Sequence, residues 1–194
     1  SIRERIHHSS GIATLYEDLP LVLRVLRDFV GDSVEKVRVD SRETCQRMLE
    51  FADKFVPEMG PRLEHYPGER PIFELYSIEE EVQRALSKKV PLKSGGYLIV
   101  DQTEAMTTID VNTGAYVGHR NLEETIFKTN LEAAAAIARQ LRLRNLGGII
   151  ILDFIDMVSE EHRQAVLKAL EKHLEKDRAK SHISQVSPLG LVEM

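Results

Sequence analysis

The sequence predicts an α/β fold of the α+β kind, in which helices and short strands alternate irregularly. Two apolar segments, residues 106–112 and 149–154, have the length and β-branched content of buried strands, and a long amphipathic helical pattern lies between them. The chain has 194 residues, of which 42% are hydrophobic and 29% are charged. A chain of this size and composition can bury a core and form one or two domains.

The first part of the chain is predicted to contain two helices and two short strands. Asp18 can cap a helix whose apolar residues recur with the 3.6-residue period, and Ser41 can cap a second helix in which Cys45 faces the core. A strand is expected over residues 34–40, between the helices, and a brief strand over 63–66. This part shows no clustered catalytic side chains.

The pattern changes near residue 90. The segment Ser77–Glu80 has the capping-box pattern and predicts a third helix that runs to about Leu86. The proline- and glycine-containing segment 91–96 then interrupts the helical pattern. Strands over 97–102 and 106–112, joined by a short turn, are expected to form a hairpin that opens a second part.

The second part is predicted to continue with a helix over residues 122–142, whose alanines permit close packing on a sheet. The strand 149–154 has no polar residue before its end, so we expect it to be central and covered on both faces. Ser159 can cap a further amphipathic helix. Two closing strands are expected over 183–186 and 189–194.

Polar side chains stand at the ends of the two apolar strands. Because side chains alternate along a strand, Thr108, Asp110 and Asn112 share one face, while Asp153 ends the other strand. If the strands are neighbours, a spacing of roughly 4.8 Å would let Asp110 and Asp153 share one Mg²⁺ ion. Oxygen ligands without Cys or His favour Mg²⁺ or Mn²⁺ over zinc. Alternatively, each aspartate caps a helix or faces water.

Basic side chains gather along the long predicted helix, although the net charge of the chain is −5. Lys128, Arg139, Arg142 and Arg144 could contact nucleic-acid phosphates, because a guanidinium group binds phosphate through paired hydrogen bonds. Arginines near a helix C-terminus are equally favoured by the helix dipole and can simply form a solvated face. The negative net charge argues mildly against a nucleic-acid partner.

The composition also bears on the cellular location. The single cysteine, Cys45, excludes an intramolecular disulfide and cannot form a zinc site alone, which is typical of a reducing compartment. No stretch of 18 apolar residues and no signal-like start is present, so we expect a cytoplasmic protein without a membrane partner. The start without Met and the end in an apolar strand suggest an excised fragment.

Four long motifs in the second part resemble one known protein family. They are residues 94–113, 123–132, 137–144 and 146–157. They resemble the catalytic core of the ribonuclease E/G family, and the resemblance extends over nearly the whole chain. It implies that residues 1–17 are the tail of a 5′-sensor region, that 18–93 form an RNase H-like scaffold subdomain, and that 94–194 form a DNase I-like catalytic subdomain.

The resemblance also implies an activity. Members of the family cut single-stranded RNA to leave 5′-phosphate and 3′-hydroxyl ends, in ribosomal RNA 5′-end maturation and in mRNA decay. The magnesium ligands of the family fall on Asp110 and Asp153, and its orienting asparagine falls on Asn112. The RNA-binding S1 domain, the zinc link and the dimerisation domain of intact members have no counterpart in these motifs. We therefore expect an intact homodimer and a weakly active or inactive fragment.

Two alternatives stay open at this point. A carboxylate pair does not specify its substrate, so the chain could be a metal-dependent phosphoesterase that acts on DNA or on small phosphates. The chain could also be a non-catalytic scaffold or dimerisation module.

Overall fold

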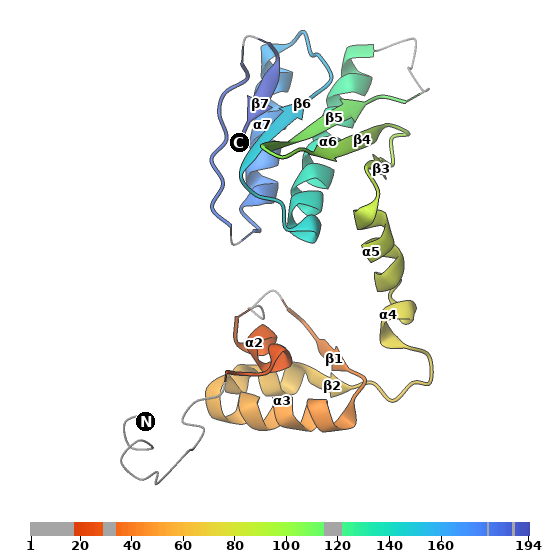
Figure 1. Ribbon diagram of the computed structural model, residues 1–194, viewed down its shortest axis with the longest axis vertical. Helices are drawn as coiled ribbons and strands as arrows, with labels where there is room; N and C mark the ends of the chain where they lie inside the picture. The colour runs from red at the N-terminus through yellow and green to blue at the C-terminus, as the bar shows by residue number, and fades with distance from the viewer. Residues whose placement is uncertain (1–17, 29–33, 115–121, 178, 188) are drawn as a thin grey trace, which may run out of the picture. The chain divides into compact units, whose positions relative to one another are not determined.

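The computed structural model describes residues 18–28, 34–114, 122–177, 179–187 and 189–194, and the predicted mixed α/β class is confirmed (Figure 1). The chain divides into two compact units, Ser1–Tyr76 and Ser77–Met194. The predicted sensor tail, residues 1–17, lies outside the described residues. The assignment of RNase H-like and DNase I-like subdomains stays a prediction. No described helix is long and apolar enough to cross a membrane.

The first unit places one helix pair beside two short parallel strands. Its elements are α2 (Leu21–Asp28), β1 (Val37–Val39), α3 (Arg42–Phe55), the 3₁₀ helix η1 (Pro57–Arg62), β2 (Leu63–His65) and α4 (Ile72–Leu75). Ser41 caps α3 as predicted, because its hydroxyl accepts a hydrogen bond from the Thr44 amide at 3.2 Å. Cys45 is buried, as predicted.

The second unit contains a five-stranded sheet in the order β3-β4-β5-β6-β7. Its elements are α5 (Ile78–Leu86), β3 (Lys89–Pro91), β4 (Tyr97–Gln102), β5 (Met106–Asn112), α6 (Leu122–Arg144), β6 (Ile149–Asp153), α7 (Glu160–Leu174) and β7 (Leu191–Glu193). β5 and β6 pair in parallel, whereas the other neighbours are antiparallel. The predicted hairpin is therefore confirmed as β4 and β5.

The core of this unit lies between one face of the sheet and the helices α6 and α7 (Figure 1). Ile109 and Leu152 of the sheet pack there with Ala134 of α6 and Val166 of α7. The prediction that β6 is covered on both faces is wrong, because Ile149 is 57% exposed. Because residues 149–152 are all apolar, the sequence alone does not show which of their side chains face the core.

Two further predictions of local structure are wrong. Ser77 does not form a capping box: its backbone is left-handed, at φ 52°, and its side chain makes no capping hydrogen bond. A residue that caps a helix N-terminus needs an extended backbone to reach the free amides. Residues 183–186 do not form a strand. The chain there is nevertheless held beside β7, since the Ser184 amide donates to the Glu193 carbonyl at 2.8 Å.

Candidate functional site

The parallel pairing of β5 and β6 places two predicted site residues side by side. Asp110 and Asp153 are Cα partners in the register; Asp153 is the last residue of β6, and Asp110 lies two residues before the end of β5. Partnered residues in neighbouring strands direct their side chains to the same face of the sheet. Both residues are exposed, while Ile109 and Leu152 beside them point into the core. The two carboxylates therefore share the face of the sheet opposite to α6 and α7.

Asn112 completes this group from the same strand as Asp110. Its Nδ2 atom donates a hydrogen bond to Oδ2 of Asp110 at 2.7 Å. Residues i and i+2 of a strand share a face, so the contact follows directly from the alternation that the sequence predicts. The hydrogen bond fixes the orientation of the Asp110 carboxylate and leaves its other oxygen available to a ligand.

The electrostatics of the pair favour a cation. Although Asp153 is an exposed residue, partial burial of its carboxyl group raises its pKa, and the negative charges of Asp110 and Asp156 raise that pKa further. A carboxylate in such surroundings is stabilised by a cation bound between the acids. The charge of Asp156, three residues after Asp153, therefore acts at the site.

The oxygen donors of the site fit Mg²⁺ or Mn²⁺. Within the part of the chain that the structure describes, no group of three or more His, Cys, Asp or Glu side chains is arranged around a common metal position. The fit therefore depends on the pair Asp110 and Asp153. Mg²⁺ is usually held by one or two carboxylates, with water and substrate phosphate as the remaining ligands, so a two-carboxylate site is adequate for it.

Helix α6 holds the segment that follows Asp153. Asn130 is fully buried, and its Nδ2 donates to the Ile155 carbonyl at 2.7 Å while its Oδ1 accepts from the Ile155 amide at 3.1 Å. One side chain thus satisfies both backbone groups of a residue two positions after Asp153. No local sequence pattern predicts this contact, because Asn130 and Ile155 are 25 residues apart in the chain.

A second side chain of α6 fixes the same segment further along. The Glu123 carboxylate accepts hydrogen bonds from the Val158 and Ser159 amides, both at 3.2 Å, and lies 3.0 Å from Nδ1 of His162. The His162 ring stacks on Phe127, with centroids 4.1 Å apart. We call the contacts of Asn130 and Glu123 with residues 155–159 the α6 clasp. The α6 clasp holds in place the backbone that contains Asp156 and directly follows Asp153.

The family model described as the ribonuclease E/G family matches residues 1–194 of the chain. The chain belongs to the ribonuclease E/G family. It is 64% identical over 180 residues to ribonuclease G of Salmonella typhimurium (strain SL1344) and 63% identical over 180 residues to ribonuclease G of Escherichia coli (strain K12). Both matches cover 93% of this chain and 37% of the relative.

A plant member of the ribonuclease E/G family is more distant. The chloroplastic ribonuclease E/G-like protein of Arabidopsis thaliana is 41% identical over 184 residues, which are 94% of this chain and 18% of that protein. The family resemblance of the sequence motifs is thereby confirmed. The segment 115–121, which by its sequence resembles ribonuclease G more than ribonuclease E, lies outside the described residues.

Three of the four basic residues that the sequence predicts to contact RNA have partners within this ribonuclease E/G chain. Lys128 pairs with Glu124 at 2.8 Å and Arg139 with Glu81 at 2.8 Å. Arg144 donates to the Ser87 carbonyl at 2.7 Å, and burial lowers its pKa.

Arg142 is exposed. A helix rises 1.5 Å per residue, so Arg144 lies about 21 Å along α6 from Asn130. RNA contact by the four predicted basic residues stays a prediction. Arg142 and Arg144 would contact a part of the RNA that lies away from Asp110 and Asp153.

The end of β5 is packed closely against the turn that precedes β4. A Cβ atom on Gly96 would lie 2.5 Å from the Asn112 carbonyl oxygen. We expect Gly96→Ala to displace Asn112, to destabilise the fold by about 1–3 kcal/mol and to lower RNA cleavage. Thermal unfolding and cleavage rates measure the two effects.

The matched control is Gly147→Ala, because a Cβ atom there meets no atom within 4 Å and its φ is not positive. Equal stability and cleavage in the two glycine variants would show that the close approach of Gly96 to Asn112 has no role in the site.

The α6 clasp makes stability depend on pH. Hydrogen bonds from the Ser159 and Val158 amides, together with His162, lower the pKa of Glu123 below its ordinary value of 4.5. The stabilisation from Glu123 is therefore fully present above about pH 4.5 and is lost as the pH falls through the lowered pKa. We expect Glu123→Gln to have a lower melting temperature than the wild type at pH 7 and a smaller further fall on acidification.

Calorimetry between about pH 3 and pH 7 measures this difference. The exposed Glu79, in the first turn of α5, provides a control, and Glu79→Gln should follow the wild-type curve. A Glu123→Gln curve parallel to that of the wild type would contradict the assigned role of Glu123.

Proposed function

We propose that the protein is a magnesium-dependent endoribonuclease that cuts single-stranded RNA and leaves 5′-phosphate and 3′-hydroxyl ends. The observation that carries this proposal is the register of β5 and β6, which pairs Asp110 with Asp153 in a chain of the ribonuclease E/G family. The relatives named ribonuclease G support the choice of RNA as substrate. Because the chain spans 37% of their length, we expect these 194 residues alone to be weakly active or inactive.

In this proposal each polar side chain of the site has a separate role. Asp110 and Asp153 hold the divalent ion, and Asn112 orients Asp110 through the 2.7 Å hydrogen bond. The ion, when bound, supplies Lewis-acid stabilisation of the phosphate charge and lowers the pKa of an attacking water. Asn130 holds the backbone after Asp153, so that the two carboxylates keep their separation during the reaction.

We further propose the biological setting that the family resemblance implies. The intact protein would act in the cytoplasm on ribosomal RNA precursors and on mRNA, as a homodimer. Mn²⁺ would substitute for Mg²⁺, since both prefer oxygen ligands. A zinc ion would be held by residues outside this chain, because its single cysteine, Cys45, is buried.

The substrate assignment is tested with matched oligomers. RNA and DNA of one unpaired sequence are incubated with the intact protein and Mg²⁺, and the products are identified by mass spectrometry. We expect cleavage of RNA alone, with a phosphate on the 5′ side of the downstream product. Equal cleavage of both oligomers would instead support a general phosphoesterase, and 3′-phosphate products would exclude the proposed chemistry.

A further inference from the structure

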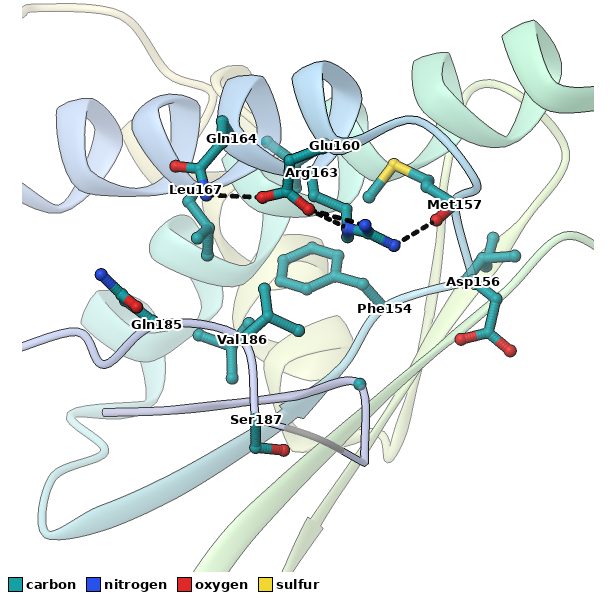
Figure 2. A pocket seen from close by; sticks show the side chains of 14 residues that line it. Phe154, Asp156, Met157, Glu160, Arg163, Gln164, Leu167, Gln185, Val186 and Ser187 are labelled. Carbon is teal, nitrogen blue, oxygen red and sulfur yellow. Dashed lines mark hydrogen bonds and ion pairs between the residues drawn. The ribbon is translucent and has the colours of Figure 1, made fainter.

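A pocket of about 340 Å³ opens directly after the strand that carries Asp153 (Figure 2). Phe154, the next residue in the chain, lines it together with Leu167 of α7 and Val192 of β7, and these three side chains are buried. Asp156 lies at one end of the pocket (Figure 2). The pocket therefore has an apolar floor and adjoins the backbone that carries Asp153 and Asp156.

The charges around the pocket do not suit an anion. Arg163 lines it, but its guanidinium group is bound to the Glu160 carboxylate, with a shortest distance of 2.6 Å, and to the Met157 carbonyl at 2.9 Å. Glu160 neutralises Arg163, and Asp156 adds a further negative charge. A phosphate group would be repelled here, whereas a neutral ligand would not.

Neutral polar groups line the other side of the pocket. Gln164 donates its amide hydrogen to Glu160 at 2.9 Å, which leaves its carbonyl oxygen as an acceptor. Gln185 is exposed and projects from the segment before β7 (Figure 2). Ser187 accepts a hydrogen bond from the Leu191 amide at 3.2 Å, and its hydroxyl hydrogen can still be donated. The pocket thus offers donors and acceptors above an apolar floor.

A nucleobase has this combination of properties. Its faces are apolar, its edge carries donors and acceptors, and it bears no charge. Single-stranded RNA is usually recognised through unstacked bases that enter such sites. A volume of about 340 Å³ also falls at the lower end of the range for small-ligand pockets, about 300–1,000 Å³.

We propose that this pocket receives one unstacked base of the RNA, from a nucleotide close to the phosphodiester held at Asp110 and Asp153. The inference rests on the proposed function and adds to it a base subsite formed by β6, α7 and the segment before β7. Because the glutamine amides can both donate and accept, the pocket selects for the presence of a base more than for one particular base.

Abasic substitution tests the subsite. RNA oligomers that each lack one base are compared for kcat/KM at a single cleavage site, with the intact protein. In the wild type, we expect loss of one nearby base to lower kcat/KM by about 5- to 100-fold, the range of measured base–protein contacts. In Gln164→Ala/Gln185→Ala the same base removal should cost about 3-fold or less, because the contacts are already absent.

Gln102→Ala, in an exposed residue at the end of β4, is the matched control and should retain the wild-type sensitivity. Equal sensitivity to base removal in the wild type and in the double variant would overturn the proposed subsite, even if RNA cleavage is normal.

A binding measurement separates this inference from the proposed function. RNA with 2-aminopurine at the sensitive position, or at each position in turn, is titrated without divalent ions, so that cleavage is not needed. We expect a fluorescence change that is lost in Gln164→Ala/Gln185→Ala and retained in Asp153→Asn. A protein that gives this signal without cutting RNA would overturn the activity and keep the base subsite, whereas a change unaffected by the glutamines would overturn the subsite.

Discussion

Asp153→Asn and Asp110→Asn should each lower RNA cleavage by about 100- to 1,000-fold, because each removes one of the two charges that hold the cation against the phosphate. The two carboxylates are Cα partners across β5 and β6. No other described acid occupies a paired position of these two strands. Asparagine preserves the shape of each side chain. We therefore expect both variants to fold and to lose Mg²⁺ affinity together with activity, as measured by calorimetric titration and single-turnover cleavage.

The control for these variants lies on the same sheet. Asp101 pairs with Thr108 in the register of β4 and β5, and its carboxylate forms an exposed ion pair with Lys88 at 3.0 Å. Exposed pairs of this kind contribute little to stability, so Asp101→Asn should retain both metal binding and cleavage. Identical Mg²⁺ titration curves for the wild type and Asp110→Asn would remove the proposed metal site.

The second large effect concerns Asn130. Asn130→Ala leaves the Ile155 amide and carbonyl without partners in a partly buried place, which should destabilise the fold by about 2–4 kcal/mol. It should also weaken Mn²⁺ binding by about 10- to 100-fold, the usual effect of removing a residue that orients a metal ligand. Denaturant unfolding measures the first effect, and titration at a temperature where both proteins are folded measures the second.

Thr129→Val provides the matched control for Asn130. Thr129 is also buried in α6, but its hydroxyl bonds locally to the Thr125 carbonyl at 2.9 Å. Its loss should lower stability modestly and leave metal affinity unchanged. If Asn130→Ala lowered stability but bound Mn²⁺ as tightly as the wild type, Asn130 would be structural only, and the α6 clasp would have no influence on the acids.

The grouping of Asp110 with Asn112 could be predicted from sequence, because both belong to one strand and side chains alternate along it. The position of Asp153 beside Asp110 could not. It depends on the register between strands separated by the whole of α6, and a shift of one residue would place the acid on the opposite face. All four residues of the run 149–152 are apolar, so the sequence does not distinguish the buried side chains from the exposed Ile149.

Serine caps show where local patterns are sufficient. Ser41 and Ser159 both accept hydrogen bonds from amides three residues later, as predicted. Ser77 has the same local pattern, but it lies at the boundary between the two compact units and adopts a left-handed backbone. Asn130 was not identified because its partner is 25 residues away, and a polar residue within a helix carries no sign of a distant backbone contact.

The α6 clasp gives an irregular segment the protection expected of regular secondary structure. The amides of Ile155, Val158 and Ser159 lie outside the helices and strands, yet each is bonded to a side chain of α6. Their exchange with deuterium from the solvent should therefore be slow and should require the segment to detach from the helix. The exchange rates of these three amide hydrogens would measure, residue by residue, how often the segment after Asp153 separates from α6.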